Sequence, residues 1–173
     1  MIDAADAFAD EKHVGQFRKN GTTPYILHPR AVVSILCDAG ITEPVILAAA
    51  LLHDTIEDTD VTYDELASLF GQPVADIVLE VTDDKSLSKT KRKQEQIRHA
   101  PHYSVAAALV KIADKIANLR DIIDEPAPDW DASRKLAYYD HARAVVVAMG
   151  SRHSTLEKVF EATYLAGASQ LKN

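Results

Sequence analysis

Apolar residues recur along most of the chain at the spacing of one helix face. In the segment 103–123, Val105, Leu109, Ile112 and Ile116 form one broad stripe, as expected when a helix turns once every 3.6 residues. The run 46–52 is apolar on all sides, which predicts a buried central helix. No segment alternates between apolar and polar residues in the way of a half-buried strand. The pattern therefore predicts an all-α protein.

Residues that start and stop helices divide this pattern into segments. Pro29 suits the first position of a helix, Gly40 suits the position after a helix end, and Thr62 with Glu65 forms a capping box. The 6 Gly and 7 Pro lie mostly between apolar segments, which indicates short loops. We predict helices at 3–19, 29–39, 43–57, 62–71, 73–82, 88–99, 103–123, 132–149 and 156–171.

Composition narrows the class of protein. With 173 residues and an apolar fraction of 47%, the chain is expected to fold as a single domain, residues 1–173, with a sizeable core. The net charge of −7 argues against nucleic acid as a partner, because duplex DNA is bound mainly through cations. The oligomeric state, including a homo-oligomer, stays open.

Cysteine content and hydropathy indicate the compartment. The only cysteine, Cys37, rules out an intrachain disulfide. The apolar run that contains residues 46–52 is far shorter than the ~20 residues that cross a bilayer. No signal peptide is apparent after Met1. We therefore expect a cytoplasmic protein that spans no membrane.

Four ionisable residues follow the apolar run: His53, Asp54, Glu57 and Asp58. In a helix that continues to residue 57, members four positions apart share a face, and three carboxylates there repel one another near the negative end of the helix dipole. A bound cation would remove that penalty. Imidazole together with carboxylate suits Mn²⁺, Fe²⁺ or Zn²⁺. As a dipeptide alone, however, His53-Asp54 is common by chance.

A metal site needs further ligands from elsewhere in the chain. His28 precedes a proline that starts a helix, and Asp114 lies inside the apolar helix 103–123. A carboxylate buried there needs a partner. That partner is either a metal or a cation such as Lys111, Lys115 or Arg18, and the residue pattern alone leaves both open.

The order of these residues resembles that in the HD-domain phosphohydrolases. The matching stretches are RKNGTTPYILHP at 18–29, AALLHDTIEDT at 49–59, FG with VTDDK within 70–85, and VKIADKIANLR at 110–120. The chain is similar to the small stand-alone RelA/SpoT-homologue hydrolases, the group of the metazoan SpoT homologue and the bacterial small alarmone hydrolases. The resemblance implies an all-helical HD-domain bundle of about eight to ten helices.

The resemblance also implies a reaction. Members of this family bind one divalent metal, usually Mn²⁺, and remove the 3′-pyrophosphate from guanosine tetra- and pentaphosphate, the alarmones of the stringent response. Carried over by position, the metal ligands would be His28, His53, Asp54 and Asp114. Glu57 and Asp58 match the acidic pair that prepares the attacking water. The products would be GDP or GTP and pyrophosphate.

Further positions match the nucleotide pocket of the family. The residues carried over as substrate-binding are Arg18, Lys19, Tyr25, Asn118 and, in the helix 132–149, Tyr138. An anionic nucleotide needs cations around it, and the chain offers Arg18, Lys19, Lys85, Lys89, Lys91, Arg92 and Lys93. For 89–93 a solvated helix face is the alternative, and for Arg18-Lys19 a charge pair at a helix end. The other histidines, His13, His99, His102, His141 and His153, are interpreted as surface or core residues.

Two other functions remain open at this point. One is a metal-dependent phosphatase for another nucleotide, such as the 2′-phosphate of NADPH or a nucleotide monoester, because the same metal, water and phosphate contacts would serve it. The other is a non-catalytic module that binds the alarmone and holds a metal for stability. The full set of candidate ligands and the acidic pair favour hydrolysis.

Overall fold

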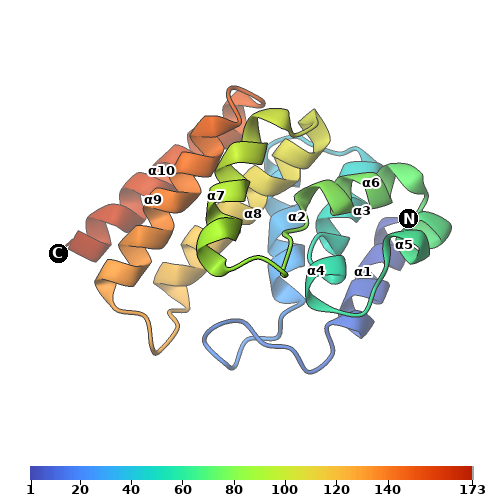
Figure 1. Ribbon diagram of the computed structural model, residues 1–173, viewed down its shortest axis with the longest axis horizontal. Coiled ribbons are helices and arrows are strands. Elements are labelled where there is room, and N and C mark those ends of the chain that lie inside the picture. Colours follow the sequence, from blue (N-terminus) through green and yellow to red (C-terminus); the bar gives the residue numbers. More distant parts are fainter. Residues whose placement is uncertain (173) are drawn as a thin grey trace.

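The computed structural model describes residues 1–172 (Figure 1). These residues form ten α-helices, one 3-10 turn and no β-strand, so the predicted all-α fold is confirmed. The helices are α1 Ile2–Lys12, α2 Leu27–Asp38, α3 Pro44–Leu52, α4 Thr55–Asp58, α5 Tyr63–Phe70, α6 Gln72–Val81, α7 Lys89–His99, α8 Val105–Asp124, α9 Ala132–Ala148 and α10 Ser154–Lys172. The 3-10 turn, Ala100–His102, joins α7 to α8.

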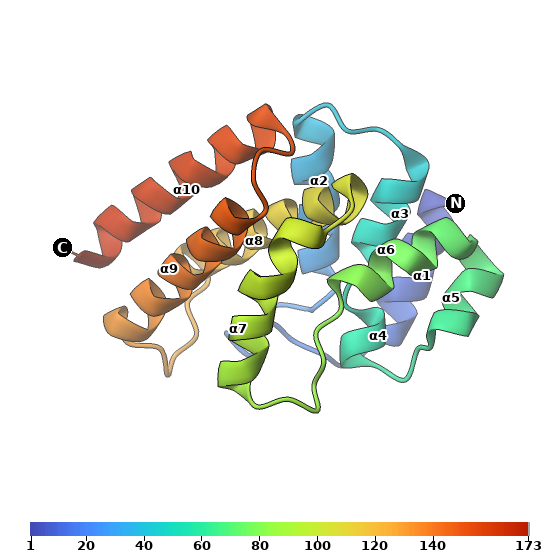
Figure 2. The ribbon, with the colours of Figure 1, turned by 45° about the horizontal axis from the view of Figure 1, so that its top comes forward.

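The helix α8 forms the centre of the molecule and packs against α2, α3, α6, α9 and α10. Its residues Ile112, Ile116 and Leu119 are fully buried, as the apolar stripe predicts. Figures 1 and 2 show α9 and α10 side by side at one end and α1, α3, α5 and α6 at the other. The apolar run from Leu47 to Leu52 in α3 is also buried. Because α3 contacts both α2 and α8, residues at the ends of α2 and α3 lie close to the middle of α8.

The predicted helix 43–57 is interrupted, and this prediction was wrong in one respect. The helix α3 ends at Leu52, residues 53 and 54 form a turn, and α4 is a separate single turn. At the break, side chains instead of backbone amides bond to the carbonyl oxygens of α3. The Thr55 hydroxyl donates to the Leu52 oxygen at 2.7 Å, and His53 Nδ1 lies 2.8 Å from the Ala50 oxygen. Such side chain–backbone bonds compete with the helical ladder. His53 and Asp54 therefore project from a turn, not from one continuous helix face.

The first predicted helix, 3–19, is too long. The helix α1 ends at Lys12, and Gly15 has a φ of +77°, a left-handed conformation that favours glycine. The following loop folds back on itself, with an isolated antiparallel bridge between Phe17 and Pro24. The Arg18 amide donates to the Thr23 oxygen at 2.8 Å. Arg18 and Lys19 therefore lie on a closed loop. The alternative interpretation, in which they are a charge pair at the end of a helix, is wrong.

The other predicted helices are present, and their ends differ from prediction by a few residues. The side chain of Thr62 caps α5 by accepting from the Glu65 amide at 3.2 Å, as the capping box predicts. Gly71, with a φ of +91°, separates α5 from α6. None of the helices in the described part of the chain combines the length and the apolar character that a bilayer crossing requires.

Candidate metal centre and nucleotide cavity

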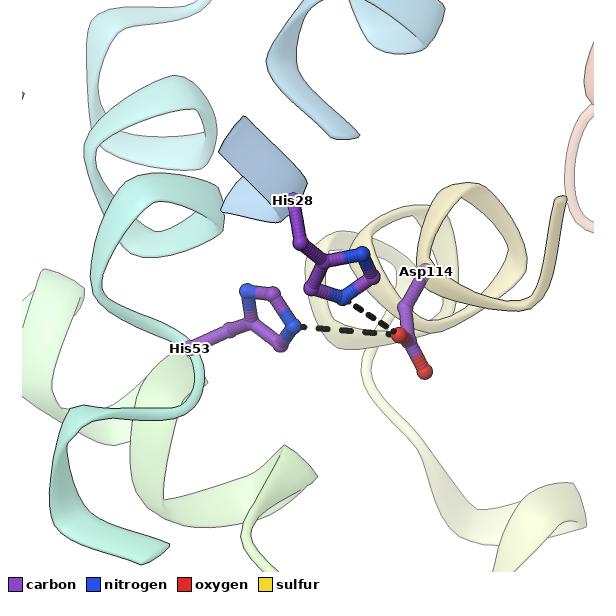
Figure 3. Close-up of side chains that lie close together, drawn as sticks. All are labelled: His28, His53 and Asp114. Carbon is purple, nitrogen blue, oxygen red and sulfur yellow. Dashed lines mark hydrogen bonds and ion pairs between the residues drawn. The ribbon is translucent and has the colours of Figure 1, made fainter. Parts of the chain in front are cut away.

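Three helices bring the predicted ligands together. His28 is the second residue of α2, His53 follows α3 directly, and Asp114 lies in the middle of α8. Ligand atoms of these three residues all lie within 4.8 Å of one another, and all three residues are buried. In Figure 3 the two imidazoles point toward the Asp114 carboxylate, with His28 Nε2 at 3.1 Å and His53 Nε2 at 3.8 Å from Oδ1. Asp54 closes the group, because its Oδ2 lies 3.1 Å from His53 Nε2 and 3.8 Å from His28 Nε2.

The hydrogen bond of the His53 imidazole fits a metal ligand. Because a carbonyl only accepts, the contact of His53 Nδ1 with the Ala50 oxygen, at 2.8 Å, places the proton on Nδ1. His53 Nε2 is buried and finds no hydrogen-bond partner within residues 1–172. A ring fixed by its other nitrogen, with the free nitrogen facing carboxylates, is the usual arrangement of a metal-binding histidine. Two imidazoles and two carboxylates form a donor set that suits a divalent cation such as Mn²⁺, Fe²⁺ or Zn²⁺.

Charges within this cluster shift its titration. Burial alone would raise the pKa of Asp114, but the charge of Lys115, 3.5 Å away, and the nearby imidazoles of His28 and His53 hold that pKa well below its usual range. Burial likewise opposes the pull of Asp54 and Asp114 on His53, and the net effect raises the pKa of His53 to about 10. Burial lowers the pKa of His28. In the metal-free protein His53 therefore carries a second ring proton at neutral pH. An incoming cation displaces this proton.

The acidic pair lies beside this cluster on α4. Burial raises the pKa of Glu57, although its Oε2 accepts a hydrogen bond from the Asp83 amide at 3.1 Å. Asp58 is more fully engaged: its Oδ2 lies 3.1 Å from the Tyr25 hydroxyl, and its Oδ1 pairs with the ammonium group of Lys85. The two carboxylates thus differ in character, because Glu57 is partly desolvated whereas Asp58 is tied to two donors.

A cavity of about 630 Å³ opens over these residues. Asp54, Glu57, Asp58 and Asp114 line one part of it. The cations that line it are Arg18, Lys19, Lys89, Arg92, Lys93, Lys111, Lys115 and Arg134. Five of the seven cations expected from the sequence are among them; Lys85 pairs with Asp58 instead, and Lys91 is not part of the lining. Asp83 and Asp129 also line the cavity, so its lining carries eight lysines and arginines against six carboxylates, an excess of positive charge in a chain of negative net charge.

Sequence reasoning missed several residues of this cavity. Lys111 and Lys115 are buried in α8, and they were considered only as ion-pair partners of Asp114; Lys115 does make that pair. Arg134, Trp130 and His141 also line the cavity. His141 was interpreted as a surface or core residue. The signal available for the two lysines was their position within one turn of Asp114 in an otherwise apolar helix.

The residues expected to bind the nucleotide all line the cavity. Their polar groups are already partnered in part: Arg18 Nη2 donates to Asp121 Oδ2 at 2.6 Å and to Asn118 Oδ1 at 2.7 Å. The Lys19 ammonium group lies over the Tyr138 ring, 5.2 Å from its centroid, within the range of a cation–π contact. Burial lowers the pKa of Lys19. These contacts hold the cations at the wall before a ligand arrives.

Comparison with known proteins decides the family. A family profile described as an HD domain matches residues 5–129. This chain belongs to the HD-domain family. The HD-domain chain is 47% identical over 160 residues to a zebrafish (Danio rerio) protein named guanosine-3′,5′-bis(diphosphate) 3′-pyrophosphohydrolase MESH1, which covers 91% of this chain and 89% of that protein. The human protein of the same name is 47% identical over 163 residues, and the match covers 93% of this chain and 90% of that protein.

A solved structure shares the whole HD-domain fold. It is a metazoan orthologue of SpoT that hydrolyses ppGpp; the TM-score is 0.91 at 39% identity, and the match covers 95% of this chain and 94% of that one. The family profile ends at residue 129, before α9 begins. Because the structural match is longer, α9 and most of α10 belong to the shared fold. Membership of this hydrolase family implies a divalent cation, and the ligand atoms of His28, His53 and Asp114 lie close enough together for a metal ion.

Proposed function

We propose that this chain is a metal-dependent guanosine-3′,5′-bis(diphosphate) 3′-pyrophosphohydrolase. The observation that carries the proposal is the convergence of His28, His53, Asp54 and Asp114 beside a cavity whose lining has more cations than carboxylates. Relatives at 47% identity bear the name of this activity. The substrate is a small nucleotide, guanosine tetra- or pentaphosphate, and the products are GDP or GTP together with pyrophosphate. In this proposal the chain acts in the metabolism of a stringent-response alarmone.

The proposed cofactor is Mn²⁺, held by His28, His53, Asp54 and Asp114. A divalent ion bound there supplies Lewis-acid chemistry, which makes water a nucleophile near neutral pH and offsets the charge of a phosphoryl oxygen. The free Nε2 of His53 supports this assignment. The mixed nitrogen and oxygen donors favour Mn²⁺ over a soft-ligand metal.

Glu57 and Asp58 have different proposed roles in preparing the attacking water. Glu57 is proposed to orient the attacking water and to accept its proton, and the raised pKa of Glu57 brings this carboxyl closer to the working pH of a general base. Asp58 is held by Tyr25 and Lys85 and fixes the geometry of the pair. The water oxygen bonds to phosphorus, the bond from that phosphorus to the ribose 3′-oxygen breaks, and the 3′-oxygen takes a proton to become a hydroxyl group.

The substrate-binding residues in this proposal are Arg18, Lys19, Tyr25, Asn118 and Tyr138. All five line the cavity, and the two cations are placed to meet phosphate oxygens by charge-assisted hydrogen bonds. The polyanionic substrate gains further from the buried ammonium groups of Lys111 and Lys115, because charge attraction is stronger away from bulk water. We propose no nucleic acid as a partner, because the net charge of −7 opposes binding to a phosphate backbone.

The remaining parts of the proposal concern the setting of the chain. We infer a single HD domain over residues 1–173, since α8 contacts helices from both halves of the chain. We infer a cytoplasmic location, which agrees with the one free thiol of Cys37. A homo-oligomer remains open.

A substrate panel tests the proposed function. Metal-stripped protein is incubated with guanosine tetraphosphate, guanosine pentaphosphate, NADPH or a nucleotide monoester, with Mn²⁺ or with EDTA, and the products are separated by anion exchange. GDP and pyrophosphate formed only with Mn²⁺ support the proposal. Preference for NADPH or a monoester would replace it with a phosphatase, and tight alarmone binding without product over hours would replace it with a binding module.

A further inference from the structure

The side chains of Gln16 and Tyr25, in the loop after α1, contact acidic residues of the site, and His13, at the start of that loop, contacts both of them. We propose that these three residues form a clamp that holds Asp54 and Asp58 in the arrangement needed for hydrolysis. In this view His13 and Gln16 are positioning residues that act without touching substrate. The inference rests on the proposed function, which supplies the reaction, but the contacts of the clamp are independent of it.

Gln16 secures the end of α4. This helix is a single turn, Thr55–Asp58, and one turn does not hold its shape without tertiary contacts. The last carbonyl groups of any helix also lack partners within the helix. The side-chain amide of Gln16 donates from Nε2 to the Asp58 carbonyl oxygen at 3.0 Å. Gln16 therefore caps α4 and fixes the backbone from which the acidic pair projects.

His13 sets the orientation of the Gln16 amide. The histidine is only 3% exposed, and its Nδ1 lies 2.8 Å from Gln16 Oε1. Because an amide oxygen only accepts, Nδ1 carries the hydrogen, and the Nε2 lone pair is left buried without a partner among residues 1–172. A buried polar atom without a partner is unfavourable, and a phenylalanine would avoid it. What the imidazole adds is the Nδ1 donor, which turns the amide nitrogen of Gln16 toward Asp58.

Tyr25 connects the same histidine to the carboxylates. Its ring stacks on His13, with centroids 4.7 Å apart and planes 27° apart. Its hydroxyl lies 2.7 Å from Asp54 Oδ2 and 3.1 Å from Asp58 Oδ2. A proton placed between two carboxylates holds them together where their charges would push them apart. His13 thus reaches the acidic residues by two routes, through the Gln16 amide and through the Tyr25 ring.

Conservative variants separate positioning from binding. In Gln16→Leu and His13→Phe we expect kcat to fall about tenfold with KM within about twofold, because the Asp58 carboxylate shifts while Asp54 and the nucleotide contacts remain in place. Neither residue touches a metal ligand, so the Mn²⁺ affinity measured by calorimetry stays within about twofold. Tyr25→Phe removes the hydroxyl from Asp54 and is expected to lower both kcat and the Mn²⁺ affinity about tenfold.

A matched control removes the same chemical group elsewhere. The Tyr164 hydroxyl also bonds to an aspartate, lying 2.9 Å from Asp140 Oδ1 between α10 and α9. Tyr164→Phe is expected to leave kcat, KM and the Mn²⁺ affinity unchanged. A loss of kcat in Tyr164→Phe equal to that in Tyr25→Phe would overturn the specific role of Tyr25.

Non-additivity and hydrogen exchange test the connection itself. If His13 acts through Gln16, the double variant His13→Phe/Gln16→Leu has nearly the same kcat as Gln16→Leu alone. If instead the losses of kcat in the two single variants multiply in the double variant, His13 does not act through Gln16. Hydrogen exchange needs no substrate: amides of residues 55–59 are expected to exchange faster in Gln16→Leu, with those of α8 unchanged. Unchanged exchange at 55–59, or faster exchange throughout the chain, would overturn the clamp.

The two proposals fail in different ways. Absence of wild-type turnover on every guanosine alarmone with Mn²⁺ present would remove the proposed function, and the exchange measurement would still decide the clamp. Normal wild-type turnover, together with unaltered kcat in both Gln16→Leu and His13→Phe, would remove the clamp and leave the function intact.

Discussion

Lowering the pH from 8 to 6 is predicted to weaken Mn²⁺ binding by about 100-fold. The reason is the proton that the metal-free cluster holds. Asp54 and Asp114 overcome the effect of burial and raise the pKa of His53 to about 10, whereas burial lowers the pKa of His28. A metal binds neutral imidazole, so one proton must leave His53 for each ion bound. Each pH unit below 10 then lowers the Mn²⁺ affinity about tenfold. Two pH units weaken the free energy of Mn²⁺ binding by about 2.7 kcal/mol.

Isothermal calorimetry measures this effect directly. Mn²⁺ is titrated into metal-stripped protein at pH 6, 7 and 8, in two buffers whose ionisation enthalpies differ, so that the number of protons released is obtained together with the Kd. We expect about one proton released per ion and a Kd that rises about tenfold for each pH unit removed. A Kd that is constant from pH 6 to pH 8 would refute the reasoning, because His53 would then be neutral before the metal arrives.

Three further predictions concern other parts of the molecule. Glu57→Gln is expected to lower kcat by about 10²- to 10⁴-fold with little change in Mn²⁺ affinity, measured by steady-state kinetics and calorimetry; unchanged kcat would exclude Glu57 as the base. Lys19→Gln is expected to raise KM about tenfold through the loss of one charge-assisted hydrogen bond, and an effect on kcat alone would contradict that role. Gly167→Ala would place a Cβ 2.2 Å from the Tyr139 hydroxyl, so the free energy of unfolding in urea should fall by about 1–3 kcal/mol; an unchanged midpoint would show that Tyr139 moves aside freely.

The periodicity of apolar residues predicted the helices well where packing and pattern agree. The stripe from Leu109 to Leu119 became the buried face of the central helix α8, because a helix with so many apolar residues is stable only when it is surrounded, whereas Val105 at the start of the stripe is exposed. The break after Leu52 was not predictable from periodicity, since the apolar run and the next turn both favour helix. It depends on the side chains of His53 and Thr55, which bond to the preceding carbonyl oxygens instead of continuing the ladder.

The candidate site was predictable in part for a similar reason. His28, His53, Asp54 and Asp114 were named from the family resemblance, and the structure places them together without testing their roles. The wall of the cavity was harder to foresee, because the spacing of Lys111 and Lys115 is equally consistent with simple ion pairs. His13 gave no signal in the sequence, since its importance comes from a loop that returns to α4. Contacts between distant segments of the chain, such as Gln16 and Asp58, need the tertiary structure.

Restoration of activity by metal tests the central claim most directly. Metal-stripped protein receives increasing Mn²⁺, and the rate of guanosine tetraphosphate turnover is followed together with the amounts of GDP and pyrophosphate. We expect no turnover without metal, a rate that rises in proportion to bound Mn²⁺ and saturates at one ion per chain, and GDP and pyrophosphate in equal amounts. Full turnover by the metal-stripped protein, or release of inorganic phosphate in place of pyrophosphate, would contradict the central claim.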